Sequence, residues 1–166
     1  MNIEANTAIT KFNQIEMFSN YALNVAGCIS ISGTSSIDID NSLFYENIAV
    51  NEVSVLHFDQ AADSYVKNSI FRNNEVERNG NTIKLVSSNA DFYNVTLENN
   101  YALEESMGML IEGSYITIDM STFRNDHSRL DFESLLIDAY VDTGKGGFFY
   151  LNDFANLIMT NSNFEN

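Results

Sequence analysis

The sequence predicts an all-β fold: a parallel β-helix, or solenoid, of about six coils stacked into a rod. Two observations support this prediction. A pattern returns about every 27 residues, and within each repeat apolar residues alternate with polar ones. A fixed period of this length is typical of repeat proteins, in which each unit buries its apolar face against its neighbours. Alternation with a period of two indicates strands that are buried on one face.

One large apolar position marks the period most clearly. It is occupied by Met17, Phe44, Phe71, Leu97, Phe123 and Phe164, with steps of 27, 27, 26, 26 and 41 residues. Each regular repeat has room for three short alternating stretches, which fit one coil of a β-helix better than a pair of helices. We therefore predict three strands per coil, with the strands of successive coils in register about 4.8 Å apart.

The alternation also predicts which side chains fill the core. One strand of each coil supplies the inward pairs Ile29 and Ile31, Leu56 and Phe58, Ile83 and Leu85, Met109 and Ile111, and Phe149 and Leu151. The next strand supplies the inward series Phe12, Ile39, Val66, Phe92, Ile118 and Met159. Each set is expected to form a stack along the axis of the rod.

Two polar columns repeat in the same register. The first contains Asn41, Asn68, Asn94 and Asn161, with Gln14 and Met120 as variants, and the second contains Asn20, Asn47, Asn74 and Asn100, with Asp126 as the variant. Asparagine adopts unusual backbone angles at turns, and stacked amides hydrogen-bond from coil to coil. We interpret both columns, and the aromatic column of Phe44, Phe71, Phe123 and Phe164, as structural ladders. Ser42, Ser69, Ser121 and Ser162 follow the first column and are expected to serve the same turn.

The step of 41 residues indicates an insertion. Counting back from Phe164 places about 15 extra residues between Asp126 and Gly146, near 127–145. Within it, Phe132, Leu135, Leu136, Ala139 and Tyr140 have the spacing of one helix face, so a short helix that begins near Asp131 is one interpretation. The other takes Leu135 to Ile137 as the regular strand, followed by a loop through Gly146 and Gly147. Both remain open on the sequence.

Charge and composition limit the classes of partner. The formal net charge is −15, which disfavours nucleic acid and anionic membrane surfaces. Cations, basic partners and neutral glycans stay open. Cys28 is the single cysteine, so an intrachain disulfide is impossible, and a small buried hydrophobe is the expected role.

The start of the chain lacks the pattern of a signal peptide, and the repeat stops in mid-pattern. Met1 and the residues after it lack the basic start and apolar run of a signal peptide, and no stretch approaches the roughly 18 apolar residues of a membrane span. The repeat would continue past Asn166. We expect residues 1–166 to form a single β-helix segment of a longer protein, with no membrane insertion in this segment.

An outward acidic pair is the strongest candidate for catalysis. Asp38 and Asp40 lie two residues apart on one strand, about 7 Å, a separation that an inverting glycosidase could use. The register, however, places Lys11 beside Asp38 and Lys67 beside Asp40. Basic neighbours lower a carboxyl pKa, which does not suit a general acid. We therefore interpret the four residues as an ion-pair strip and predict no catalytic residue.

Other chemistry-bearing residues are scattered. Asp91 and Asp119 are outward but not aligned, and His57 and His127 lie on different parts of the rod, so no metal or cofactor site is predicted. Glu104 and Glu105 are at most a weak calcium site in a turn. Asn94-Val95-Thr96 is the single N-glycosylation sequon. We expect Asn94 to be a ladder amide turned inward; the alternative is that it carries a glycan.

Short motifs in the repeats resemble those of a known family. Phe44-Tyr45-Glu46-Asn47, Phe71-Arg72-Asn73-Asn74 and the weaker Phe123-Arg124-Asn125-Asp126 resemble the FxxN element of the polymorphic outer membrane protein repeats. Gly146-Gly147-Phe148-Phe149 and Ala26-Gly27-Cys28-Ile29 resemble the paired GGxI element. The resemblance implies a right-handed, pectin-lyase-like parallel β-helix at the cell surface or outside the cell.

Two functions follow as hypotheses. The first is a non-enzymatic structural or adhesive segment of a cell-surface or extracellular protein that associates with itself or with neighbouring segments of the same protein, and that assembles end to end into a filament. The alternative is a glycan-binding or glycan-cleaving module, with a groove formed by Tyr65, Tyr93, Tyr140 or Tyr150. Fold alone does not decide between them.

Overall fold

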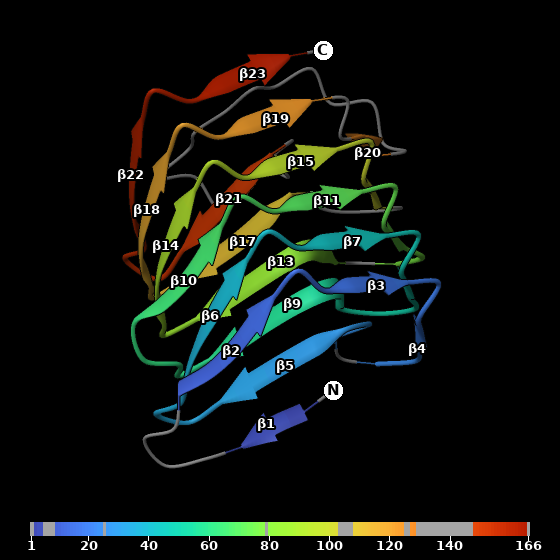
Figure 1. The fold of residues 1–166 in the computed structure, drawn as a ribbon, viewed down its shortest axis with the longest axis horizontal. Helices are drawn as coiled ribbons and strands as arrows, with labels where there is room; N and C mark the ends of the chain where they lie inside the picture. Colours follow the sequence, from blue (N-terminus) through green and yellow to red (C-terminus); the bar gives the residue numbers. More distant parts are fainter. Residues whose placement is uncertain are drawn as a thin grey trace.

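The computed structural model describes residues 2–4, 9–24, 26–78, 80–102, 108–124, 127–128 and 148–165. These residues form only strands, joined by turns, and every strand pairing is parallel. The strands form four sheets that wind around one axis, with the N-terminus at one end of the stack and the C-terminus at the other (Figure 1). The predicted fold class, an all-β parallel β-helix, is confirmed.

Three sheets have six strands each, one from each pass of the chain. Sheet A contains β1 (Asn2–Glu4), β5 (Ile29–Ser32), β9 (Val53–Asp59), β13 (Asn81–Val86), β17 (Met109–Glu112) and β21 (Phe149–Asn152). Sheet B contains β2 (Ile9–Asn13), β6 (Ser36–Asp40), β10 (Ser64–Lys67), β14 (Asn89–Tyr93), β18 (Tyr115–Asp119) and β22 (Asn156–Thr160). Sheet C contains β3 (Glu16–Phe18), β7 (Leu43–Tyr45), β11 (Ile70–Arg72), β15 (Thr96–Glu98), β19 (Thr122–Arg124) and β23 (Asn163–Glu165).

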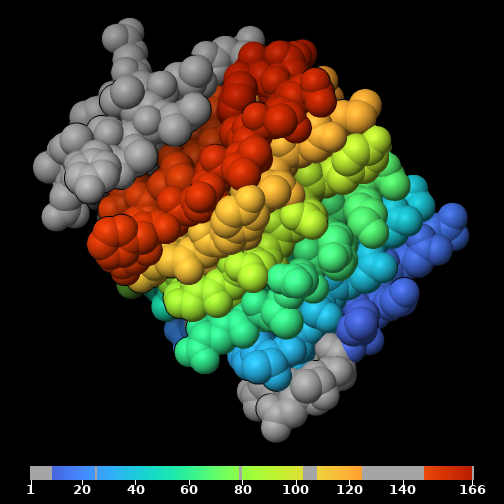
Figure 2. Space-filling view, turned by 90° about the vertical axis from the view of Figure 1, so that its left-hand side faces the viewer, coloured from blue at the N-terminus to red at the C-terminus, as the bar shows by residue number. Residues whose placement is uncertain are grey.

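A fourth sheet corrects the expectation of three strands per coil. Sheet D contains β4 (Tyr21–Ala22), β8 (Ile48–Ala49), β12 (Glu75–Val76), β16 (Tyr101–Ala102) and β20 (His127–Ser128). Its strands are only two residues long, so they are too short to show alternation in the sequence. In the space-filling view the coils appear as successive bands, each lying against the next (Figure 2).

The predicted register of the core is confirmed residue by residue. In sheet B, Val66 pairs with Ile39 on one side and with Phe92 on the other, and all three side chains are buried. In sheet C, Phe71 pairs with Phe44 and Leu97. The rings of Phe44 and Phe71 stack with their centroids 4.9 Å apart. The apolar columns therefore form one continuous core along the axis.

Each coil changes direction at residues with positive φ, a conformation that asparagine and glycine adopt more readily than most residues. Between sheets B and C these residues are Gln14, Asn41, Asn68, Asn94, Met120 and Asn161. Between sheets C and D they are Ser19, Glu46, Asn73 and Asn99. Where the chain enters sheet A, Gly27 is needed because a Cβ there would lie 2.2 Å from the backbone oxygen of Ser54.

The insertion is smaller and begins later than expected. His127–Ser128 still pairs with β16, so the regular coil continues to Ser128. Met109 pairs with Phe149, an offset of 40 residues, whereas Ile116 pairs with Leu157, an offset of 41. One extra residue therefore lies in the turn between β21 and β22, where Asp153 and Phe154 both have positive φ. The alternatives of a helix from Asp131 or a strand at Leu135 concern residues outside the described ranges.

Candidate functional site

The second asparagine column forms a ladder that holds neighbouring coils together. Its side chains continue from one coil to the next, and Asn47, Asn74 and Asn100 are buried. The Nδ2 of Asn47 donates to the Oδ1 of Asn74 at 2.9 Å, and the Nδ2 of Asn74 donates to the Oδ1 of Asn100 at 2.9 Å. The Nδ2 of Asn20 donates to Asn47 in the same way at 2.8 Å. The prediction of a structural ladder is correct for this column.

Every amide in the interior of this ladder is used more than once. The Oδ1 of Asn74 also accepts the backbone N–H of Asn47 at 3.1 Å, and its Nδ2 also donates to the carbonyl oxygen of Phe44 at 3.2 Å. Asparagine suits this position because one amide group supplies both an acceptor and two donors. A buried backbone N–H at each turn is thereby satisfied without water.

The first asparagine column lies on the outer surface, and its side chains do not turn inward as expected. Asn41, Asn68, Asn94 and Asn161 are exposed, because each is itself the residue with positive φ, and its side chain points outward. The Nδ2 of Asn94 donates to the Oδ1 of Asn68 at 2.8 Å, and that of Asn68 donates to Asp40 at 2.8 Å. Coil-to-coil bonds are therefore present, but the prediction that Asn94 turns inward is wrong.

Buried serines form two further columns at the turns. In the predicted column, the backbone N–H of Ser42 donates to the Oγ of Ser69 at 3.1 Å, and that Oγ donates to the carbonyl oxygen of Lys67 at 2.6 Å. A second column, which the sequence analysis missed, lies between sheets A and B: the N–H of Ser88 donates to the Oγ of Ser114 at 2.9 Å. Its members directly follow a residue with positive φ: Ser88 follows Ser87, and Ser114 follows Gly113.

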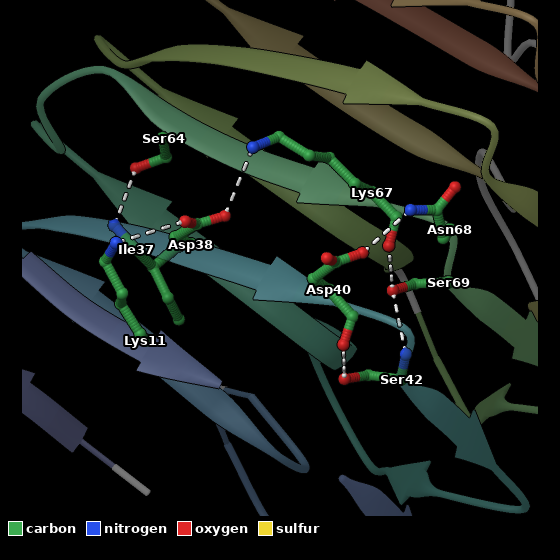
Figure 3. A network of polar contacts seen from close by, with 9 residues as sticks. All are labelled: Lys11, Ile37, Asp38, Asp40, Ser42, Ser64, Lys67, Asn68 and Ser69. Carbon is green, nitrogen blue, oxygen red and sulfur yellow. Dashed lines mark hydrogen bonds and ion pairs between the residues drawn. The ribbon is translucent and has the colours of Figure 1, made fainter. Parts of the chain in front are cut away.

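The outward acidic pair is tied into the coils, although not in the expected pairing (Figure 3). Lys11 and Lys67 both lie beside Asp38, with Nζ–carboxylate distances of 3.8 and 3.5 Å. Lys67 is in register with Asp40, but its side chain reaches diagonally to Asp38 instead. Asp40 receives the amide of Asn68. The ion-pair strip is present, with Asp38 as its centre, and the expected Lys67–Asp40 pair is not formed.

Another outward column, on sheet C, combines rings and charges. The rings of Phe18 and Tyr45 stack with centroids 5.1 Å apart, and the guanidinium of Arg72 lies 5.5 Å from the Tyr45 centroid. Further along the column, the Nε of Arg124 donates to Glu98 at 2.6 Å. These residues are in register across successive coils. The column stabilises the outer face by cation–π and ion-pair contacts.

Among the described residues, three titratable groups have shifted pKa values, each for a separate reason. Burial raises the pKa of the Cys28 thiol to about 12, and the residue lies just before β5, as a small buried side chain. Burial, and secondarily Lys84, lowers the pKa of His57. Hydrogen bonds from Thr160 and Asn161 lower the pKa of Asp119. These groups lie apart from one another and do not form a catalytic set.

A pocket of about 210 Å³ opens on the outer face of sheet B. It is lined by Asp63, Ser64, Tyr65, Asn89, Ala90, Asp91 and Tyr115. Tyr65 and Tyr115 are 39% and 46% exposed, whereas Ser64 and Ala90 form the buried floor. The pocket spans three successive coils, because Tyr65 pairs with Asp91 and Asn89 pairs with Tyr115. It brings aromatic rings, carboxylates and an amide to one place.

Other predicted residues do not join this pocket. Tyr93 is on the same face but in another column, in register with Asp119, and Tyr150 is on sheet A. Asp91 and Asp119 are not aligned, as predicted. Tyr140, Glu104 and Glu105 lie outside the described ranges. Across the part of the chain that the structure describes, no group of three or more His, Cys, Asp or Glu residues could hold a metal ion.

Membrane crossing and known relatives give no further assignment. The described residues include no helix with the length and apolar character needed to span a bilayer. Comparisons with protein-family models, with curated proteins and with solved structures found no match to this chain.

Proposed function

We propose that this chain is a non-enzymatic structural or adhesive segment of a cell-surface or extracellular protein, built to stack with further coils. The observation that carries the proposal is the use of the repeated polar residues. Asn47, Asn74, Ser69 and Ser88 are all buried and bonded to the neighbouring coil. Such residues add cohesion along the axis and are not available for chemistry on a substrate.

The coil faces at the two ends are incompletely covered and match one another. Phe12 and Met17 in the first described coil, and Met159 and Phe164 in the last, are half-buried, whereas their counterparts in the middle coils are fully buried. In a longer stack, Met159 would continue onto the position of Phe12, and Phe164 onto that of Met17. Apolar faces in matching register favour a further coil, from a neighbouring segment or a second copy.

The resemblance to the polymorphic outer membrane protein repeats supports a surface location, and the contacts give its motif a physical meaning. In Phe44-Tyr45-Glu46-Asn47 the phenylalanine joins the stacked rings, Glu46 makes the turn with positive φ, and Asn47 enters the buried ladder. The motif therefore encodes one corner of the coil, between sheets C and D. Membership of that family, and the adhesive role it implies, belong to the proposal.

Sedimentation velocity tests the stacking. The chain is expected to form concentration-dependent oligomers, and Met159→Lys should abolish them by placing a charge on the end face. Ile158→Lys is the matched control, because Ile158 is the exposed neighbour on the same strand. Mixing Met159→Lys with Phe12→Glu should restore a dimer, since each variant keeps one intact face. A monomer at all concentrations would refute end-to-end assembly.

A further inference from the structure

The acids of the pocket on sheet B are bonded to neutral groups and not to cations. Elsewhere, acidic side chains that lie near cations pair with them: Asp38 with Lys11 and Lys67, and Glu52 with Lys84. In the pocket, the carboxylate of Asp63 accepts the amide of Asn89 at 3.1 Å, and that of Asp91 accepts the hydroxyl of Thr117. Both bonds come from neutral groups, and none of the described lining residues is cationic.

Two aromatic rings complete the pocket. Tyr65 and Tyr115 line it beside the two carboxylates and are both partly exposed. An aromatic face attracts a cation through the ring quadrupole, and carboxylates attract it through charge. A formal net charge of −15 over the chain adds a long-range attraction for cationic partners.

The chain itself shows this combination of groups holding an ammonium. The Nζ of Lys67 lies 4.8 Å from the centroid of the Tyr65 ring and 3.5 Å from the carboxylate of Asp38. One tyrosine and one aspartate therefore suffice to position a lysine side chain on this face. The pocket adds a second ring, Tyr115, and two carboxylates, Asp63 and Asp91, to the Tyr65 ring that Lys67 already contacts. Its volume of about 210 Å³ can take the end of a lysine or arginine side chain.

We propose that this pocket binds an ammonium or guanidinium group presented by a basic protein partner, with Asp63 and Asp91 neutralising the charge and the rings of Tyr65 and Tyr115 enclosing its alkyl stem. The proposal deepens the adhesive part of the proposed function, on which it rests, by naming the chemistry of the partner. A neutral glycan would also stack on the rings, but it would leave both carboxylates without a counter-charge.

Binding of a matched pair of probes tests the proposal. Nα-acetyl-arginine amide and its uncharged isostere Nα-acetyl-citrulline amide are titrated into the ¹⁵N-labelled chain, and the backbone amide signals of Asn89, Asp91 and Tyr115 are followed by NMR. We expect saturable shifts with arginine and none with citrulline. Raising the ionic strength from about 50 mM to about 500 mM should weaken arginine binding several-fold, because screening reduces the attraction of exposed charges.

Variants then locate the site. Asp63→Asn with Asp91→Asn should weaken arginine binding about tenfold or more, equivalent to one or two lost charge contacts. Asp59→Asn with Asp153→Asn is the charge-matched control, because both residues lie outside the pocket lining. If the pocket variant does not fold, the comparison of arginine with citrulline on the unaltered chain still decides.

Three results would overturn the proposal: equal shifts with citrulline, equal loss of binding in the control variant, or saturable binding of a neutral oligosaccharide at the same residues that persists at high salt. None of these bears on stacking, which sedimentation tests separately. Oligomers without arginine binding would overturn the pocket and leave the structural role standing.

Discussion

Replacing one amide of the buried ladder by an isosteric carboxylate should destabilise the chain strongly. Asn74→Asp keeps the shape of the side chain and the two bonds accepted from Asn47. It removes the two bonds that Asn74 donates, to the Oδ1 of Asn100 and to the carbonyl oxygen of Phe44. The introduced oxygen then faces two acceptors in a buried site.

The magnitude follows from the bonds lost. The two buried hydrogen bonds that are lost contribute about 1 kcal/mol each. The Oδ1 of Asn100 still accepts the backbone N–H of Asn74 at 3.1 Å, so it keeps one donor. Burial of an uncompensated carboxylate adds to this, so we expect a loss of roughly 4 kcal/mol or more in the free energy of unfolding at neutral pH. Such a loss is at the upper end for a single substitution.

The pH dependence gives this prediction a specific signature. Burial and the facing oxygens should raise the pKa of the introduced carboxyl in the folded chain above its unfolded value. The charge-dependent part of the destabilisation is therefore smallest below about pH 4, where the carboxyl is protonated in both states. It grows as the pH rises from the unfolded pKa to the folded pKa and is constant above that. A protonated carboxyl also restores one donor.

Urea unfolding followed by circular dichroism measures the effect, with Asn41→Asp as the control. Asn41→Asp is the same chemical change at an exposed turn position. Asn41 has positive φ, and aspartate tolerates that conformation. The control should change the free energy of unfolding by less than about 0.5 kcal/mol. If Asn74→Asp costs no more than Asn41→Asp at pH 7, the asparagine ladder does not contribute to stability as argued.

Three further outcomes follow from single positions. Because the pKa of His57 is lowered in the folded chain, the unfolded chain binds a proton there at a higher pH, near 6.5. Stability should therefore fall as the pH drops below about 6.5, and His57→Gln should reduce the slope of stability against pH in urea titrations. An unchanged slope would contradict the shift. The buried Oγ of Ser54 has no hydrogen-bond partner among the described residues, so Ser54→Ala should be neutral or stabilising by about 1 kcal/mol in the same assay. A loss of stability would contradict this. Gly27→Ala should destabilise the chain by about 2 kcal/mol or more, because the added Cβ would lie 2.2 Å from the backbone oxygen of Ser54. A melting temperature equal to that of the unaltered chain would contradict this and show that the coils separate easily there.

The sequence predicted the core because its signal is periodic. Each inward residue repeats at 26 or 27 positions, so aligning Ile39 with Val66 and Phe92 was enough to predict their pairing. The insertion changed the offset of the last coil but not its pattern, and Phe164 still pairs with Phe123. The two-residue strands of sheet D had no such signal, since alternation needs more residues to be visible.

The two asparagine columns show where residue type alone misleads. Both repeat the same side chain, but Asn94 has positive φ and points outward, whereas Asn47 follows a positive-φ residue and points inward. A shift of one residue relative to the turn reverses the side of the sheet. The position of the turn residue, and not the asparagine, decides which column is buried.

The pocket could be predicted only in part. The period aligns Tyr65 with Asp91 and Asn89 with Tyr115, so the sequence contained the columns. Whether neighbouring columns enclose a cavity depends on side-chain rotamers, which no period encodes. Lys67 pairs with Asp38 and not with Asp40 for the same reason. A long flexible side chain reaches diagonal neighbours as readily as direct ones.

The most direct test of coil-on-coil stacking is site-specific cross-linking between copies. Glu16 and Asn163 occupy the same outward column of sheet C in the first and last described coils. In a stacked pair their Cα atoms would lie about 4.8 Å apart, within the range of a disulfide. Phe18→Cys with Asn163→Cys is the control, since a shift of two residues along the strand gives about 8 Å. Oxidation should yield a series of covalent oligomers for Glu16→Cys with Asn163→Cys and little for the control; equal or absent cross-linking in both would contradict end-to-end stacking in register.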